Sequence, residues 1–296
     1  MPVPVEEVRR RLPGAQLTEV SLPEDAGATW VVELPPDDDL VGAWTATRDA
    51  VADLGLHPVA VADWGDDGWP AADLFSRFSY GEGPGTGPAQ VLARAEELSV
   101  DAARDWFRRR GPGDAGDDWG EVVAFELEVT EREVGARPDD DVWAGVRHGD
   151  AIGLERRLLR WEQERRPTEP AAPSTRFGWF DPTGMRTGLV LLPVTAPADS
   201  LAHLSFFGAD GRGGHEALVR LARDWERRFG AELVANWGTM LQLVVARPPA
   251  ELDEAFDLAV ELVTVARCTT ALTGESTRHL ARHLWRGERW FLHERP

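Results

Sequence analysis

Apolar residues recur at helical spacing along much of this 296-residue chain. Leu218, Leu221, Ala222, Trp225 and Phe229 fall on one side of a helix when residues 214–229 are wound at 3.6 residues per turn. We therefore expect this helix to bury that side in a hydrophobic core. The same spacing predicts further helices over residues 37–55, 88–109 (restarting at Ser99), 153–166, 250–265 and 275–285.

Runs of aliphatic and β-branched residues, bounded by turn-forming residues, predict strands between these helices. A hairpin is expected where RFGWF and TGLVLLPV flank a DPTG turn at residues 181–184. The other predicted strands cover residues 29–34, 57–64, 121–129, 231–237 and 239–246. The mixture predicts an α/β (α+β) protein in which amphipathic helices pack on mixed sheets.

A proline-rich stretch, RRPTEPAAPSTR at residues 165–176, interrupts the pattern, because neither a helix nor a central strand accepts it. We expect two subdomains, residues 1–166 and 177–296, joined by a linker over residues 167–176. Two glycine-rich stretches, residues 80–88 and 110–118, are expected to be exposed loops.

Two short motifs occur in both halves. VADWG at residues 61–65 matches VANWG at 234–238, and ARDW occurs at 103–106 and again at 222–225. The two matches do not share one register. The matches can therefore reflect either a degenerate repeat or chance in a biased composition, and we favour chance.

Charge and residue usage exclude several function classes. The formal net charge of −19 argues against nucleic acid and anionic membranes as ligands and permits a protein partner with a basic surface. Lysine is absent, which excludes a lysine base, a Schiff base and a phosphate-loop lysine. A single cysteine, Cys268, rules out an internal disulfide. With no signal-like N-terminus and no long apolar run, we expect a cytoplasmic protein without a membrane span.

Four short patterns follow one another in the second half of the chain. DWERRFGAELV is an aromatic helix end before Gly-Ala, and LQLVVARPP is a strand that ends in two prolines. EAFDLAVE is helical, and WFLHE is an aromatic and acidic tail. In this order they resemble the bacterial family called domain of unknown function 4253, over about residues 187–294. The resemblance implies no established activity, and the first half carries no comparable signature.

Several positions depart from that family's pattern. Typical members carry acidic residues where Thr239 and Gln242 stand, and a polar residue where Leu262 stands. Their Cys-Pro-Asp run is absent here, with Cys268 displaced, and their aromatic-aromatic-Asp ending is LHE at residues 292–294. If the family's polar residues form a site, this chain keeps part of it.

The candidate binding residues are Trp225, Arg228, Asn236 and Trp237. Arg228 lies one turn after Trp225, so it either covers the indole and keeps its guanidinium in water or forms an anion-binding fork. Asn236 ends a predicted strand, where ligands meet α/β sheets and where asparagine also forms turns. Trp237 is a candidate interface anchor.

The segment HLARH places His279 and His283 one helical turn apart, as in many metal sites, with Glu275 and His293 as further candidate ligands. The glutamate that serves as base in zinc hydrolases is missing from this segment, so we favour a solvated helix face. No nucleophile signature surrounds Cys268, and we expect no cofactor.

Because no complete catalytic set is present, we expect a non-catalytic, acidic protein-binding module, either immunity-like or regulatory. Two alternatives stay open. The first is a hydrolase or transferase with a cleft between the subdomains, which requires Arg228, Asn236, Glu261 and His279 to converge in one pocket. The second is a metal-binding protein that uses His279 and His283.

Overall fold

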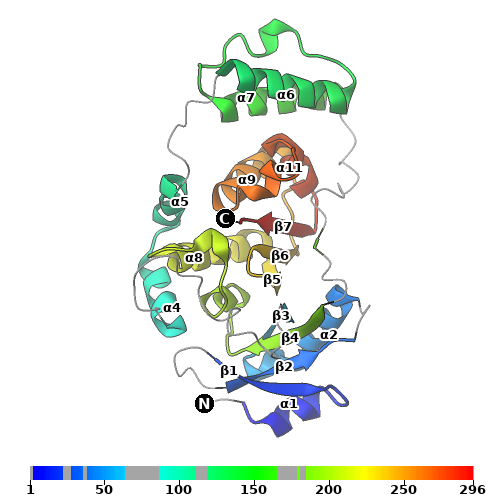
Figure 1. Cartoon of the computed structure of the whole chain (residues 1–296), viewed down its shortest axis with the longest axis vertical. Helices are drawn as coiled ribbons and strands as arrows, with labels where there is room; N and C mark the ends of the chain where they lie inside the picture. Colours follow the sequence, from blue (N-terminus) through cyan, green and yellow to red (C-terminus); the bar gives the residue numbers. More distant parts are fainter. Residues whose placement is uncertain are drawn as a thin grey trace.

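Seven strands form one mixed sheet in the part of the chain that the computed structural model describes, namely residues 3–22, 28–35, 39–63, 87–110, 119–165, 179–180 and 185–295. Their order across the sheet is β1-β2-β4-β3-β5-β6-β7, and β3 and β5 are the parallel pair among antiparallel neighbours (Figure 1). The strands are β1 (Leu17–Ser21), β2 (Ala28–Glu33), β3 (His57–Asp63), β4 (Arg186–Leu192), β5 (Ala231–Asn236), β6 (Met240–Val245) and β7 (Arg289–His293).

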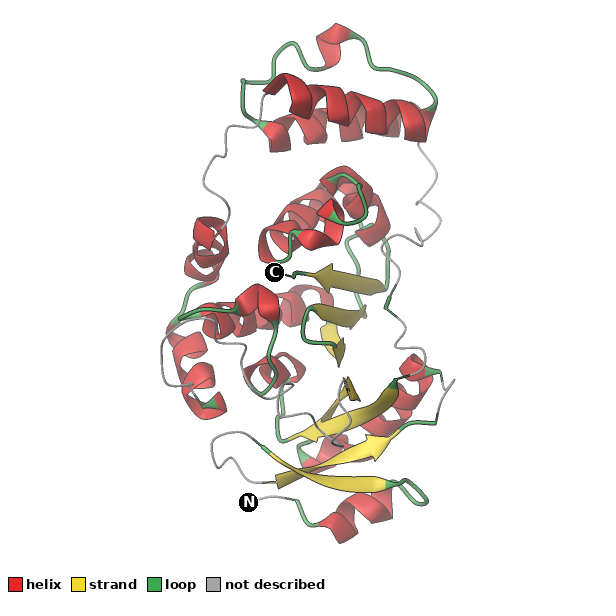
Figure 2. Cartoon of the chain, in the orientation of Figure 1, coloured by secondary structure: helices red, strands yellow, loops and turns green. Residues whose placement is uncertain are grey.

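Helices cover both faces of this sheet (Figure 2). The α-helices of the described residues are α1 (Val5–Arg11), α2 (Leu40–Val51), α4 (Pro88–Glu97), α5 (Val100–Arg110), α6 (Trp119–Val134), α7 (Ala151–Arg165), α8 (Gly214–Phe229), α9 (Leu252–Val265), α10 (Cys268–Ala271) and α11 (Thr277–Leu284). The chain is therefore an α+β protein, as the pattern predicted. None of the helices described is long and apolar enough to cross a membrane.

Alternating side chains divide the sheet between two hydrophobic cores. Val59 and Val190 face the larger core, which α4, α5, α8, α9 and α11 complete. Ala60 and Leu189, their neighbours along the same strands, face the smaller core, which includes residues of α1 and α2. This alternation follows from the two-residue period of a strand, and it explains why the central strands read as continuous apolar runs.

Helix α8 confirms the prediction made from its apolar spacing. Its predicted face, including Leu218, Trp225 and Phe229, is buried in the larger core. Gly230 ends the helix in a left-handed conformation with φ 61°, and its N–H bonds to the carbonyl oxygen of Glu226 at 2.7 Å. A side chain there would meet Ala246 Cβ at 3.0 Å, so glycine allows β5 to start directly against β6.

The predicted strand over residues 121–129 is wrong, because these residues belong to α6. In the helix, Leu127 packs with Leu154 and Leu158 of α7 in a small separate core. Helical winding also turns Glu126 toward Arg278 of α11. Contacts with two other helices therefore override the β-like alternation of the segment.

The predicted halves share the sheet. Strand β4, from the second half, lies between β2 and β3 of the first half. The predicted linker over residues 167–176 and most of the first arm of the predicted hairpin lie outside the described residues, as do residues 80–86 and 111–118 of the predicted loops.

Helices α6 and α7 form a hairpin at one end of the molecule (Figure 1). Its attachment to α11 centres on the fully buried Arg278, whose Nε donates to Glu162 Oε1 at 2.8 Å and whose Nη1 donates to Glu126 and Glu155. Burial lowers the pKa of Arg278, but the three glutamates outweigh it and raise the pKa above its ordinary value. An ion cluster thus fastens the hairpin to the body.

Candidate functional site

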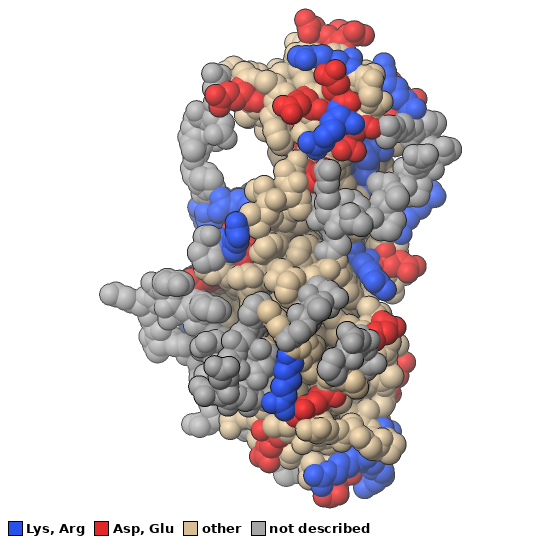
Figure 3. Space-filling view, turned by 45° about the vertical axis from the view of Figure 1, so that its right-hand side comes forward, with Lys and Arg blue, Asp and Glu red and all other residues tan. Residues whose placement is uncertain are grey.

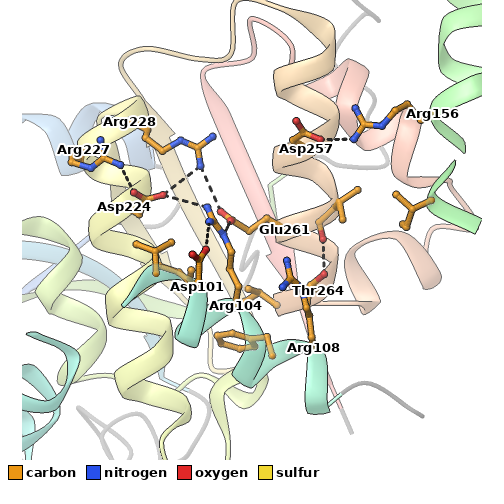
Figure 4. A pocket seen from close by; sticks show the side chains of 16 residues that line it. Asp101, Arg104, Arg108, Arg156, Asp224, Arg227, Arg228, Asp257, Glu261 and Thr264 are labelled. Atoms are coloured by element: carbon orange, nitrogen blue, oxygen red, sulfur yellow. Dashed lines mark hydrogen bonds and ion pairs between the residues drawn. The ribbon is translucent and has the colours of Figure 1, made fainter. Parts of the chain in front are cut away.

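A cavity of about 720 Å³ opens where α5, α8 and α9 meet, with the start of α7 at one end (Figure 4). Apolar side chains, among them Phe107, Leu221 and Val260, form part of its wall. Its charged lining consists of Arg104, Arg108, Arg156, Arg227 and Arg228 together with Asp101, Asp224, Asp257 and Glu261. We call this cavity the arginine pocket.

Glu261, on α9, lies at the centre of the pocket's polar network. The indole N–H of Trp225 donates to its Oε1 at 2.6 Å, and Arg228 Nη1 lies 4.0 Å from the same oxygen. Its other oxygen accepts a hydrogen bond from Nε of Arg104 on α5. Three helices therefore meet on one carboxylate whose side chain is 10% exposed.

Asp224, on α8, is the second acceptor of the network, and its side chain is 4% exposed. Arg227 and Arg228 reach it from three and four residues further along the helix, the spacing at which helical neighbours meet. Arg104 Nη2 lies 3.7 Å from its Oδ2. Burial lowers the pKa of Arg104, but the hydrogen bond and charge of Glu261 outweigh this and raise the pKa above its ordinary value.

The four predicted binding residues divide into one at the surface and three in the interior. Arg228 lines the pocket, and its side chain is 26% exposed. The exposed fractions of Trp225, Asn236 and Trp237 are 0%, 0% and 2%. A direct contact with a partner is therefore open only to Arg228.

Arg228 adopts a geometry that combines parts of both interpretations. Its guanidinium carbon lies 4.5 Å from the ring centre of Phe229 rather than over Trp225, and it pairs with Asp224. The guanidinium therefore lies beside the ring of Phe229 and is paired with a carboxylate.

Asn236 and Trp237 both support the turn between β5 and β6. Asn236 Nδ2 donates to the carbonyl oxygen of Ser205 at 3.0 Å, and its Oδ1 accepts from the N–H of Gly238 at 2.7 Å. The indole N–H of Trp237 donates to Gln242 Oε1 at 2.8 Å. These contacts give Asn236 the turn-forming role that competed with ligand binding.

The histidines of α11 have separate surroundings. His279 Nδ1 lies 2.6 Å from Glu275 Oε2. The pKa of His283 is lowered, because the effect of burial exceeds the opposing effect of its backbone hydrogen bond with Arg289. Within the described ranges, no three His, Cys, Asp or Glu residues are grouped so that they could hold a metal ion.

The polar set expected for an enzyme does not meet in the pocket. Arg228 and Glu261 line it, whereas Asn236 and His279 do not. The four residues proposed for an enzyme therefore do not converge in this pocket.

Two central residues of the network, Arg104 and Asp224, were not among the predicted site residues. Both lie in the repeated ARDW motif, whose copies fall on α5 and α8 and are brought together by the packing of these helices. The motif was visible in the sequence, but its two copies are far apart in the chain and only tertiary packing pairs them.

The order of α8, β5, β6, α9 and β7 follows the order of the four C-terminal patterns. Residues 188–293 match the family model described as Domain of unknown function (DUF4253). The DUF4253 segment supplies Asp224, Arg227, Arg228 and Glu261 to the pocket, while Arg104 comes from outside it. Comparison with curated proteins and with solved structures finds no match.

Proposed function

We propose that this protein is a non-catalytic module of the cytoplasm, immunity-like or regulatory, that binds a protein partner whose surface is basic overall. The observation that carries the proposal is the arginine pocket, an open cavity whose charged side chains pair with one another. Such a network offers polar recognition groups to a partner without assembling a nucleophile and a base.

Long-range attraction supports a basic partner. A net charge of −19 speeds the encounter with a positively charged surface, an effect that falls with ionic strength. Acidic and basic side chains lie side by side at both ends of one face of the molecule (Figure 3). Specific docking therefore depends on local pairing as well as on the total charge.

The rim of the pocket offers carboxylates to such a partner. Asp101 and Asp257 line the pocket, and their side chains are 89% and 66% exposed. Basic side chains of the partner can approach each of them, in competition with Arg104 at Asp101 and with Arg156 at Asp257, without displacing the buried carboxylates Asp224 and Glu261.

The test is capture of partners from a native cell extract by the full-length protein, followed by titration of the purified partner at low and high salt. We expect Asp101→Asn combined with Asp257→Asn to weaken binding several-fold at low salt, since an exposed ion pair contributes about 0.2–1 kcal/mol. Asp49→Asn is the matched control, because Asp49 is 64% exposed and lies on α2.

Equal weakening by the control and by the double variant would contradict docking at this rim. Failure to recover any partner at low salt would contradict the function itself.

A further inference from the structure

The arginine pocket holds more hydrogen-bond donors than its own carboxylates can accept. Each guanidinium carries five N–H groups, and each carboxylate has about four acceptor positions. Asp224 accepts from or pairs with Arg104, Arg227 and Arg228, so its acceptor positions are largely occupied. Glu261 is similarly surrounded by Trp225, Arg104 and Arg228.

The arginines, by contrast, keep donors in reserve. Among the described residues, the ion pairs of Arg228 use Nη1 and that of Arg227 uses Nη2. Arg227 is also 72% exposed, so its guanidinium can turn toward an incoming group. The excess of donors means that the interior of the pocket, unlike the exposed carboxylates at its rim, is complementary to an acceptor-rich group.

The guanidinium of Arg228 is held in place before any ligand arrives. Its Nη1 lies 3.4 Å from Asp224 Oδ2 and 4.0 Å from Glu261 Oε1, and the Phe229 ring lies 4.5 Å from its central carbon. A guanidinium held in this way loses little side-chain entropy when it binds a carboxylate or phosphate through two parallel hydrogen bonds.

We propose that the arginine pocket is a binding site for an oxyanion, with Arg227 and Arg228 as its donors. The inference rests on the proposed function and deepens it: the oxyanion is the carboxylate of an acidic side chain that the protein partner inserts. Phe107 and Val260 line the same pocket, so an apolar residue beside that acidic side chain fits the wall.

The negative net charge does not oppose this site at close range. Exposed charges are screened over about 8 Å at physiological ionic strength, so the nearest groups dominate the binding of a small anion. The nearest groups are the five arginines and four carboxylates that line the pocket, together with Asp105, which pairs with Arg108 at 2.8 Å, and Asp253, which pairs with Arg156 at 3.7 Å, so the charges around the site nearly cancel.

Calorimetric titration of the full-length protein with three probes tests the proposal. The probes are the capped peptide acetyl-Glu-Leu-Glu-amide, its lysine counterpart and inorganic phosphate. We expect the acidic peptide to bind and the lysine peptide not to bind. Arg228→Gln should weaken the acidic peptide at least tenfold, and Arg228→Lys should recover only part of the loss because lysine lacks the planar fork.

The matched control is Arg9→Gln, because Arg9 is 58% exposed and pairs with Glu6 on α1, outside the pocket. Circular dichroism of every variant shows whether it is folded. Equal binding of the acidic peptide by Arg228→Gln and by the wild type would overturn the site. Tighter binding of phosphate than of the acidic peptide, with the same loss in Arg228→Gln, would overturn the acidic side chain as the source of the oxyanion.

The two proposals fail in different ways. A partner that binds wild type and Arg228→Gln equally would overturn the oxyanion site and leave the protein-binding function. Binding of the acidic peptide, together with failure to recover any protein partner from the cell extract, would overturn the function and leave the site.

Discussion

Arg278 offers the sharpest test of how the α6–α7 hairpin is attached. Its side chain is 0% exposed and lies among Glu126, Glu155 and Glu162, while its Nη2 also donates to Thr130 Oγ1 at 2.9 Å. Replacement by methionine keeps the chain length similar and removes the cation. The three glutamates then lose the guanidinium with which all of them pair.

The expected cost follows from the partners that remain. Glu162 keeps Arg282 at 3.3 Å, and Glu155 keeps the backbone N–H of Thr277 and of residue 278. Glu126 loses its ion pair in a buried position. Removal of one partner from a buried ion cluster costs about 3–5 kcal/mol, so we expect Arg278→Met to lower the free energy of unfolding at pH 7 by this amount.

The assay is urea denaturation followed by circular dichroism, with Arg160→Met as the control. Arg160 pairs with Asp253 at 3.5 Å and is 64% exposed, so its loss should cost about 0–1 kcal/mol. In the Glu126→Gln background, Arg278→Met should lower the free energy of unfolding by less than it does in the wild type. The reason is that the buried carboxylate of Glu126, which Arg278→Met would leave without its ion pair, is already absent. A loss below about 1 kcal/mol for Arg278→Met, or one no larger than that of Arg160→Met, would refute the reasoning.

Two further predictions concern pH. Burial, followed by the negative charge of Glu155, raises the pKa of the Glu126 carboxyl to about 7. The protonated carboxyl therefore contributes fully to stability below the ordinary pKa of 4.5, and this contribution disappears as the pH rises through 7. Relative to the wild type, Glu126→Gln should therefore gain about 1–3 kcal/mol between pH 5 and pH 8 in urea titrations, and a constant difference would contradict this. Burial lowers the pKa of His57 to about 4, so its contribution is complete above 6.5 and is lost as the pH falls through 4. Thermal melts of His57→Gln should lose less stability than the wild type between pH 7 and pH 4, and parallel losses would count against it.

The best-predicted parts of the fold are the helices and strands in which the spacing of apolar residues fits only one type of secondary structure. Helix α8 and the two strands after it follow directly from apolar spacing and from the glycine near position 238. The segment 121–129 failed because its alternation also fits a helix once Leu127 and Glu126 find partners on α7 and α11. The local pattern of apolar residues cannot distinguish a strand from a helix when contacts with distant segments determine which of the two forms.

The candidate site was predictable only in part, for a similar reason. Trp225 was expected to be shielded, and it is. The pocket depends on Arg104 reaching Glu261 across more than half of the chain, and no sequence spacing encodes that pair. A buried role for Asn236 and Trp237 follows from the tight β5–β6 turn, which uses their side chains for its own hydrogen bonds.

The position of β4 between β2 and β3 has a consequence for synthesis on the ribosome. Strands β2 and β3 emerge early, but the strand that joins them is translated only after the helices α4 to α7. Until then each nascent strand presents an open edge to which another polypeptide can add. The edges of β2 and β3 that pair with β4 therefore stay without their native partner until residue 192 has emerged.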